Sequence, residues 1–111
     1  MDNNALDQLA RDHAGCSIAA FADIEVGIVL RTGADLDVGQ ETLNSLCAKG
    51  KQVFGAMSSP SDLAIQAIDK TTLIFVRVPD DPSSVLIAQC DRTVPLNDFI
   101  PQARACVEGT P

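Results

Sequence analysis

Residues 63–91 read LAIQAIDKTTLIFVRVPDDPSSVLIAQCD and contain three apolar runs. The runs cover residues 63–69, 71–78 and 85–91, and the loop at 79–84 is rich in Pro, Asp and Ser. Apolar runs of this length between turn residues are typical of β-strands. The second and third runs are the most continuously apolar, so we expect them in the centre of a sheet, covered on both faces.

The run at 63–69 alternates as a strand does, but neither of its faces is clearly polar, and it has no charge before Asp69. Natural proteins usually protect an edge strand with Lys, Pro or a bulge, because a bare edge recruits another chain. At a sheet edge this strand would offer unpaired backbone groups on an uncharged strip, which predicts pairing with another chain. The residues expected at that interface are Leu63, Ala64, Ile65, Gln66, Ala67 and Ile68.

One helix and two strands are expected before this region. Apolar residues at helical spacing predict a short helix over residues 5–13, ending near Gly15, which can adopt the left-handed cap conformation. Cys16–Ala22 is nearly all apolar, as expected for a central strand. A second strand, Gly27–Thr32, follows a turn at residues 23–26.

A long helix between the two groups of strands has the clearest pattern in the chain. Asp37 and Gln40 form a D-x-x-Q capping pattern at its start, and the segment 58–61 ends it. Its apolar stripe, expected to cover the sheet, is Leu43, Leu46, Cys47, Gly50, Val53, Phe54 and Met57. A second line of small or neutral residues on another side is Ser45, Ala48, Gln52 and Gly55. Such a line either admits a close neighbouring helix or is an ordinary solvated face.

A final helix is expected to begin between Thr93 and Asn97. Its apolar stripe is Leu96, Ile100, Ala103 and Val107. Pro101 would interrupt the interior of a helix that starts at Val94, although it suits the first turn of one that starts near Ile100. We therefore expect a kinked or two-piece helix.

Length and composition restrict the class of protein. The chain has 111 residues, of which 46% are hydrophobic, and it fits a single domain over 1–111. Its net charge of −7 comes with scattered basic residues, no Trp and no Tyr, which argues against binding to nucleic acid or anionic membranes. The polar N-terminus and the absence of a long apolar run predict a cytoplasmic protein. Its four widely spaced cysteines are then expected to be reduced and mostly buried.

No combination of residues predicts catalysis, a metal site or a cofactor site. His13 is the only histidine, and a reversal at Gly15 separates it from Cys16. Asp80 and Asp81 lie between prolines, which favours a solvated turn over a cation site, because a hard cation needs six or more oxygen ligands. Phosphate-binding loops, nucleophile elbows and paired histidine motifs do not occur.

The order helix, two strands, helix, three strands, helix resembles the roadblock/LC7 family over Leu6 to Glu108. The segments that carry the resemblance are CSIAAFADIEVGIVLRTG at 16–33, LNSLCAKGKQVFGAM at 43–57 and LAIQAIDKTTLIFVRVPDDPSSVLIAQCDR at 63–92. One departure lies in the first hairpin, where three residues rather than two separate Asp23 from Gly27. The resemblance implies an α/β (α+β) profilin-like sandwich of topology α-β-β-α-β-β-β-α. Its five-stranded antiparallel sheet has the order 2-1-5-4-3, with helices on both faces.

The resemblance also implies a function. Family members are non-enzymatic subunits, commonly regulators of Ras-like small GTPases or adaptors in multiprotein complexes. They form homodimers in which the two third strands pair and the long helices lie side by side. No individual GTPase-binding residue can be carried over, because the family has no fixed contact motif. Two alternatives stay open: a small-molecule sensor of profilin-like or PAS-like type, and a cysteine-dependent enzyme with a fast-reacting thiol.

Overall fold

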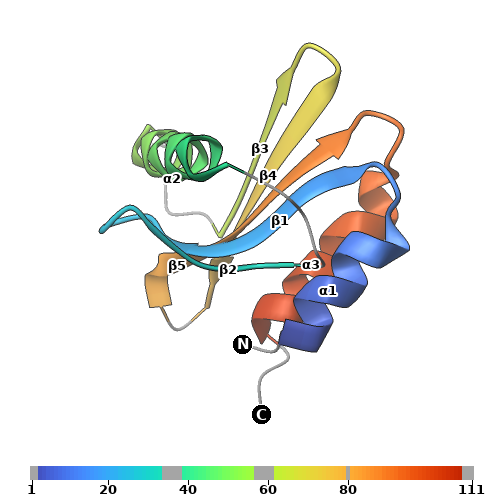
Figure 1. Ribbon diagram of the computed structural model, residues 1–111, viewed down its shortest axis with the longest axis horizontal. Helices are drawn as coiled ribbons and strands as arrows, with labels where there is room; N and C mark the ends of the chain where they lie inside the picture. The colour runs from blue at the N-terminus through green and yellow to red at the C-terminus, as the bar shows by residue number, and fades with distance from the viewer. Residues whose placement is uncertain (1–2, 34–38, 57–61, 80, 109–111) are drawn as a thin grey trace.

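An antiparallel sheet lies between two layers of helices in the computed structural model, which describes residues 3–33, 39–56, 62–79 and 81–108 (Figure 1). The elements in these ranges are α1 (Asn3–Asp12), β1 (Cys16–Asp23), β2 (Ile28–Thr32), α2 (Gln40–Gly55), β3 (Leu63–Ile68), β4 (Thr71–Val78), β5 (Asp81–Asp91) and α3 (Leu96–Glu108). This order of elements is the one that the sequence predicted.

The strand order is β2-β1-β5-β4-β3, with every neighbouring pair antiparallel. The expected five-stranded, profilin-like sheet is therefore confirmed, as are the central positions of β1, β4 and β5 and the edge position of β3. These three central strands are the most apolar because side chains on both of their faces are covered. β2 and β3 are the two edges of the sheet.

The sheet has a hydrophobic core on each face. On one face α2 covers a core that contains Ile18, Leu46, Phe54, Phe75 and Ile87. On the other face α1 and α3 cover a second core. Figure 1 shows α2 on one side of the sheet and the α1–α3 pair on the opposite side. Residues that alternate along β4 therefore enter two different cores.

The predicted stripe of α2 covers the sheet. Leu43, Leu46, Cys47, Gly50 and Phe54 are buried, and Val53 is half-buried. Met57 lies outside the described residues, as do Asp37 and the breaker segment 58–61. The predicted capping pattern does not set the start of the helix, because α2 begins at Gln40 with Gly39 as an extended N-cap and no side-chain hydrogen bond to that cap.

The left-handed cap expected at Gly15 is wrong. Helix α1 ends at Asp12, and the left-handed glycine among the described residues is Gly27, at φ +82° in the β1–β2 turn. Gly15 is instead required for space, since an added Cβ would lie 2.7 Å from Val94 Cγ2 and 3.1 Å from Asp91 Cβ. A glycine selected by close packing and one selected by backbone conformation look alike in sequence.

Further details of three elements, β3, β5 and α3, differ from expectation. β5 begins at Asp81 rather than Val85, because Val78 pairs with Asp81 after a bulge and the Asp81 carboxylate accepts hydrogen bonds from the hydroxyls of Ser83 (2.9 Å) and Ser84 (2.7 Å). Of the two alternatives at Pro101, the two-piece helix is wrong, since α3 is assigned as one helix from Leu96 with Pro101 inside it. Asp69 ends β3 one residue early, in a left-handed turn at φ +53°.

Candidate dimerisation surface

The β3 edge has the regular geometry that strand pairing requires. β3 pairs with β4 over six consecutive residues, from Leu63 opposite Val76 to Ile68 opposite Thr71, with no shift in register. No other strand of the described residues pairs with the opposite side of β3. A straight, regular strand presents its backbone N–H and C=O groups at even intervals, so this edge is a usable template for another strand.

The six predicted interface residues of β3 differ in exposure. Ile65 and Ile68 are exposed by 44% and 38%, which is high for large apolar side chains. Ala67 is exposed, Leu63 and Gln66 are half-buried, and Ala64 is buried in the core beneath α2. The edge therefore combines a regular strand backbone with partly exposed apolar side chains.

Two buried polar atoms beside this edge have no hydrogen-bond partner among the described residues: Oε1 of Gln66 and Nε of Arg77. Gln66 pairs with Leu73 across β3 and β4, and Leu73 belongs to the α2-side core, so Gln66 lies on the face that carries α2. Arg77 lies on the same face, where its guanidinium carbon is 4.1 Å from the centre of the Phe54 ring. An unsatisfied buried polar atom costs about 1–3 kcal/mol. Arg77 was not identified from the sequence, because its neighbours Val78 and Pro79 do not indicate a contact with Phe54.

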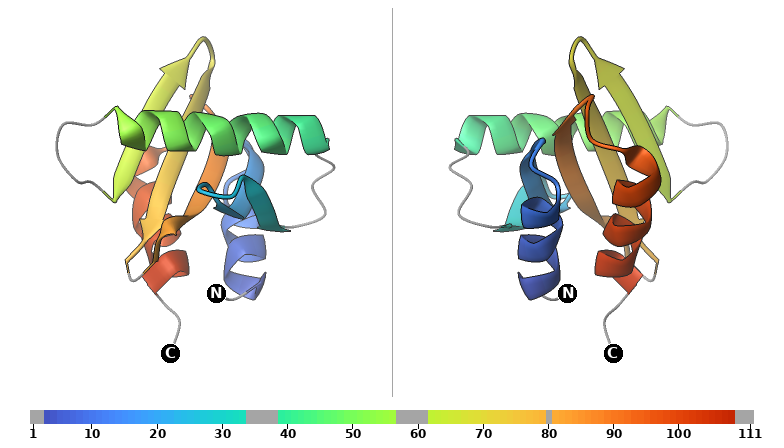
Figure 2. Two further views of the ribbon diagram at one scale, coloured as in Figure 1. Left: turned by 90° about the vertical axis from the view of Figure 1, so that its left-hand side faces the viewer. Right: turned by 90° about the vertical axis from the view of Figure 1, so that its right-hand side faces the viewer.

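The second predicted line, on α2, is solvent-exposed at all four positions: Ser45, Ala48, Gln52 and Gly55. Figure 2 shows α2 crossing the sheet, with its C-terminal end toward β3. The C-terminal end of this line therefore lies near the β3 edge, and the rest of the line follows α2 across the sheet. Within the described residues no element covers the line.

The opposite edge, β2, is unlike β3. Its register with β1 shifts between Phe21 and Ala22, which leaves Leu30 as the extra residue of a bulge. A bulge disrupts the even spacing of backbone groups and so disfavours pairing with another strand. β2 nevertheless carries exposed apolar side chains, Ile28 at 52% and Leu30 at 53%, and the neighbouring turn exposes Val26 at 66%. The sequence analysis did not identify this apolar group.

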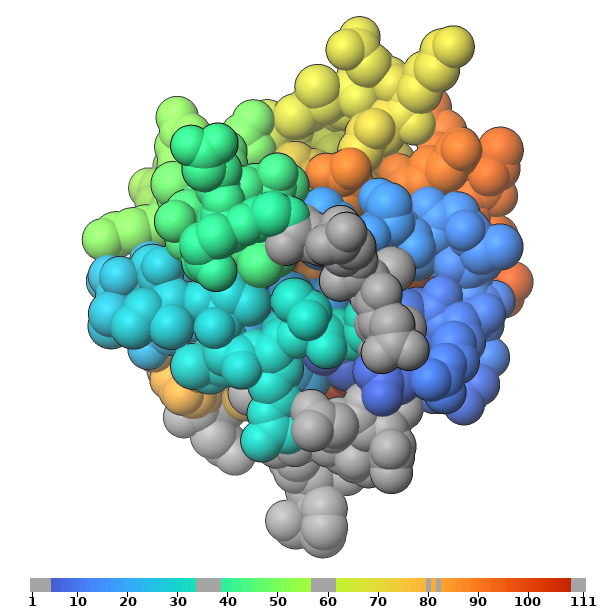
Figure 3. All heavy atoms as spheres, viewed as in Figure 1, coloured from blue at the N-terminus to red at the C-terminus, as the bar shows by residue number. Residues whose placement is uncertain are grey.

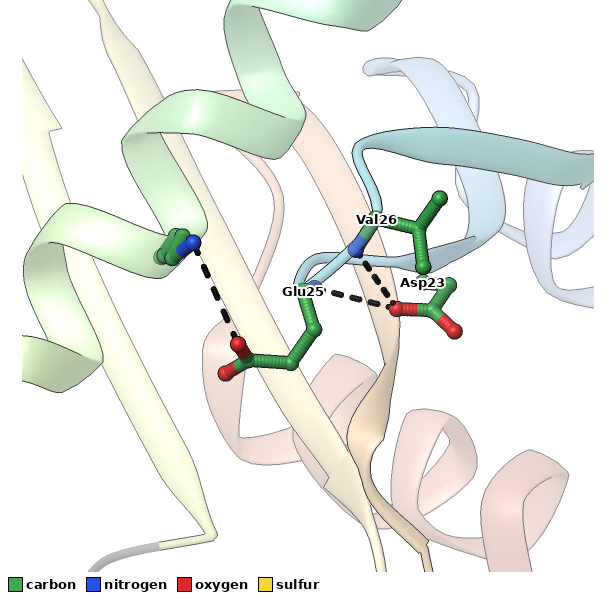
Figure 4. A network of polar contacts seen from close by, with 4 residues as sticks. Asp23, Glu25 and Val26 are labelled. Atoms are coloured by element: carbon green, nitrogen blue, oxygen red, sulfur yellow. Dashed lines mark hydrogen bonds and ion pairs between the residues drawn. The ribbon is translucent and has the colours of Figure 1, made fainter.

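Asp23 gives the β1–β2 turn a defined shape. Its Oδ1 accepts hydrogen bonds from the backbone N–H groups of Glu25 (3.0 Å) and Val26 (3.1 Å), as Figure 4 shows. Lys51 of α2 lies 3.9 Å from the Glu25 carboxylate in an exposed ion pair. The hairpin and α2 are accordingly side by side on one face of the molecule (Figure 3). The longer Asp23–Gly27 spacing is therefore compatible with an ordered turn.

The cysteines and the histidine do not form a nucleophile–base pair. All four cysteines are buried, and the His13 ring contacts Gln102, at 3.0 Å from Oε1, and Phe99, edge-to-face at 4.9 Å between ring centres. Burial, with the charge of Asp23, raises the pKa of Cys47. A thiol that is both inaccessible and harder to ionise is a poor nucleophile. Cys47 is therefore a poor candidate for the nucleophile of a cysteine-dependent enzyme.

Surface clefts also give little support to a small-molecule sensor. A cleft of about 370 Å³ lies between α2 and the sheet, and its lining is Glu41, Thr42, Ser45, Leu46, Lys49, Leu73 and Gln89. Ligand pockets of this size are usually lined mainly by apolar and aromatic groups, whereas charged and polar side chains predominate here. Within the described ranges, no three His, Cys, Asp or Glu side chains are grouped to hold a metal ion. No described helix is long and apolar enough to cross a membrane.

The fold is similar to two groups of solved structures. The layered sheet and helices define a profilin-like α+β sandwich: the chain superimposes on Schizosaccharomyces pombe profilin with a TM-score of 0.62 over 95% of this chain and 92% of that one, at 13% identity. More particularly, the fold is that of the roadblock/LC7 domain. A Roadblock/LC7 domain from Streptomyces avermitilis matches with a TM-score of 0.78, 9% identity and coverage of 97% and 92%.

A further group of similar structures is MglB. Myxococcus xanthus MglB matches with a TM-score of 0.74 and 17% identity, over 95% of this chain and 87% of that chain. The sequence matches no protein-family model and has no significant similarity to a curated protein. The resemblance inferred from the order of elements is thus confirmed by three-dimensional structure, at identities where pairwise sequence comparison gives no signal.

Proposed function

We propose that this chain is a non-enzymatic regulatory or scaffold subunit that forms a homodimer through β3 and α2 and acts on a Ras-like small GTPase or another protein partner. The observation that carries the proposal is the β3 edge, which is regular, uncharged and partly apolar. A protein that worked alone would be expected to protect such an edge, as the bulge at Leu30 does on β2.

The position of the two-fold axis in the proposed dimer can be restricted to two residues of β3. A two-fold axis perpendicular to the sheet would keep both copies of α2 on one face. In an antiparallel pair, the side chains of directly opposite residues point to the same face. The axis must therefore lie between two copies of the same residue, so that this residue is directly opposite its own copy. Ile65 and Gln66 are the two positions nearest the middle of β3.

Centring the axis on Gln66 would explain its unpartnered oxygen. Directly opposite residues have Cβ atoms about 4.5–5.5 Å apart, which lets each Gln66 amide donate Nε2–H to Oε1 of the other copy. The two buried acceptors would then satisfy one another, and no charge would enter the interface. The same axis would bring the small-residue lines of two α2 helices toward each other, where Ala48 and Gly55 permit close approach.

The GTPase part of the proposal rests on the resemblance to the roadblock/LC7 fold. Its mechanism would be positioning: a dimer that binds one conformation of the GTPase switch segments more tightly shifts the population toward that conformation. The net charge of −7 would favour a partner surface with basic residues.

Light scattering coupled to size exclusion, at micromolar concentration, tests the dimer. We expect a mass twice that of the 11.7 kDa chain. A monomer at that concentration would overturn the self-association. Immobilised chain incubated with Ras-like GTPases from the same cell, loaded with GDP or a non-hydrolysable GTP analogue, tests the partner. We expect retention that depends on the nucleotide, whereas equal or absent retention in both states would overturn regulation of a GTPase.

A further inference from the structure

Two buried cysteines face each other across neighbouring strands. The register of β1 and β5 places Cys16 opposite Cys90, and both side chains belong to the core beneath α1 and α3. On one side of this pair the backbone N–H of Asp91 donates to the carbonyl of Gly15 at 2.9 Å, as it does beside a non-hydrogen-bonded pair, and on the other side the register shifts between Cys16 and Ile18. In such non-hydrogen-bonded antiparallel pairs the Cα atoms are about 4.5 Å apart, which lies within the range of about 4.4–6.8 Å that a disulfide spans.

The two thiols already interact. The Cys16 thiol donates to the carbonyl of Ile18 at 3.3 Å, and the adjacent Cys90 thiol holds the pKa of Cys16 below its usual value, whereas the pKa of Cys90 is raised by Cys16 and by burial. The register places Cys90 directly across from Cys16, as a resolving thiol must lie, and the two pKa directions favour Cys16 as the attacking thiolate. The remaining cysteines are placed differently: the Cys106 thiol donates to the carbonyl of Ala5 at 3.4 Å, and Cys47 lies in the core on the opposite face of the sheet.

The start of β1 lies beside a surface cleft. Cys16 is 6% exposed and directly follows Gly15, which lines a cleft of about 330 Å³ together with Val94 and Pro95. Hydrogen peroxide is close to water in size, so a small local opening at the start of β1 admits it. Larger thiol reagents would need a wider opening.

We propose that Cys16 and Cys90 form an oxidative modification site at which a peroxide converts the thiol pair to a cross-strand disulfide. The Cys16 thiolate attacks one peroxide oxygen, the O–O bond breaks, and the departing hydroxide takes up one proton to leave as water. The Cys90 sulfur then displaces the hydroxyl of the Cys16 sulfenic acid, forming the S–S bond and releasing a second water. In total, two thiols lose two electrons and two protons to one peroxide.

The test uses the full chain, first reduced, then treated with hydrogen peroxide at a temperature where circular dichroism shows the native fold. Free thiols are alkylated after denaturation and counted by mass spectrometry. We expect two of the four thiols to resist alkylation, a peptide map that links Cys16 to Cys90, and reversal by a dithiol reductant. Cys47→Ser, on the other face of the sheet, should form the same link, whereas Cys16→Ser and Cys90→Ser should form none.

Several results would overturn the proposal. These are four alkylated thiols after oxidation, a link that involves Cys47 or Cys106, a link between two chains, or oxidation beyond sulfenic acid without an S–S bond. Peptide mapping of the unmutated chain decides the matter even if a serine variant fails to fold. The inference does not depend on the proposed dimer, because the thiol pair lies on the sheet face opposite α2.

Discussion

Replacing Gln66 by Glu tests the proposed dimer with a minimal change of shape. In the monomer the side chain is half-buried at a sheet edge with its Oε1 buried, so the carboxylate also lowers the stability of the monomer, and circular dichroism must show that the fold persists. In a dimer centred on this residue, two carboxylates would instead face each other. Two unit charges about 4 Å apart interact by about 4 kcal/mol at an effective dielectric constant of 20. Since each 1.4 kcal/mol is tenfold in affinity, the dimer should weaken on the order of a thousandfold.

The effect should also depend on pH. Repulsion between the two carboxylates would raise their pKa in the dimer above the usual value of about 4.3 for Glu. The dimer would then bind more protons than two monomers do, so its affinity should recover as the pH falls from 7 toward 5. Sedimentation equilibrium across this range measures the dissociation constant. The matched control is Gln89→Glu, which adds the same charge on β5, two strands away from the edge, and should leave association unchanged.

Retention of the unmutated dissociation constant by Gln66→Glu at pH 7, with no dependence on pH, would refute an axis at this residue. A second variant, Ile65→Lys, then distinguishes an axis at another residue of β3 from an interface that does not involve β3. It places a charge on the other face of the same strand, where the 44% exposed Ile65 would be buried by pairing. If Ile65→Lys also remains dimeric, the interface does not involve β3.

Three further predictions concern the stability of the fold. Gly33→Ala should lower the free energy of unfolding by about 1–3 kcal/mol, measured by urea denaturation, because the new Cβ would lie 2.9 Å from both Cγ and the backbone oxygen of Leu6. Gly27→Ala, which meets nothing within 4 Å but has φ +82°, should cost about 1–2 kcal/mol through backbone strain alone. A hydrogen bond from Arg104 at 3.0 Å lowers the pKa of Asp62, so the resulting stability is present above about pH 4, the usual Asp value, and is lost as the pH falls through the folded-state pKa. Arg104→Gln should therefore lower the urea midpoint at pH 7, by a small amount because the pair is exposed, and the deficit should shrink at pH 3.

Much of the fold could be predicted because strand and helix periodicities are local properties. The apolar run of β4 and the stripe of α2 each report which side chains must be buried, whatever their neighbours are. Boundaries were less predictable. β5 begins early because Asp81 finds partners in two serine hydroxyls, and α3 continues through Pro101, against a rule derived from helix interiors.

The candidate dimerisation surface likewise has some residues that could be predicted from the sequence and some contacts that could not. Its β3 residues could be proposed from an uncharged alternating strip, and their edge position is confirmed, while their role in pairing stays a prediction. Neither the unpartnered Gln66 oxygen nor the stacking of Arg77 on Phe54 could be predicted, since each depends on which strand and helix meet there. The bulge at Leu30 was equally hidden, although it is what distinguishes the two edges.

The order of elements, the central strands and the uncharged character of residues 63–68 could all be predicted from the chain, because each follows from the hydrophobicity of near neighbours in it. The need for space at Gly15 and the irregularity of the β2 edge became visible in the folded molecule alone. The tertiary structure also decided that Cys16 lies opposite Cys90, 74 positions later in the chain. These are properties of register and contact between distant segments, and the packing of the complete sheet sets them.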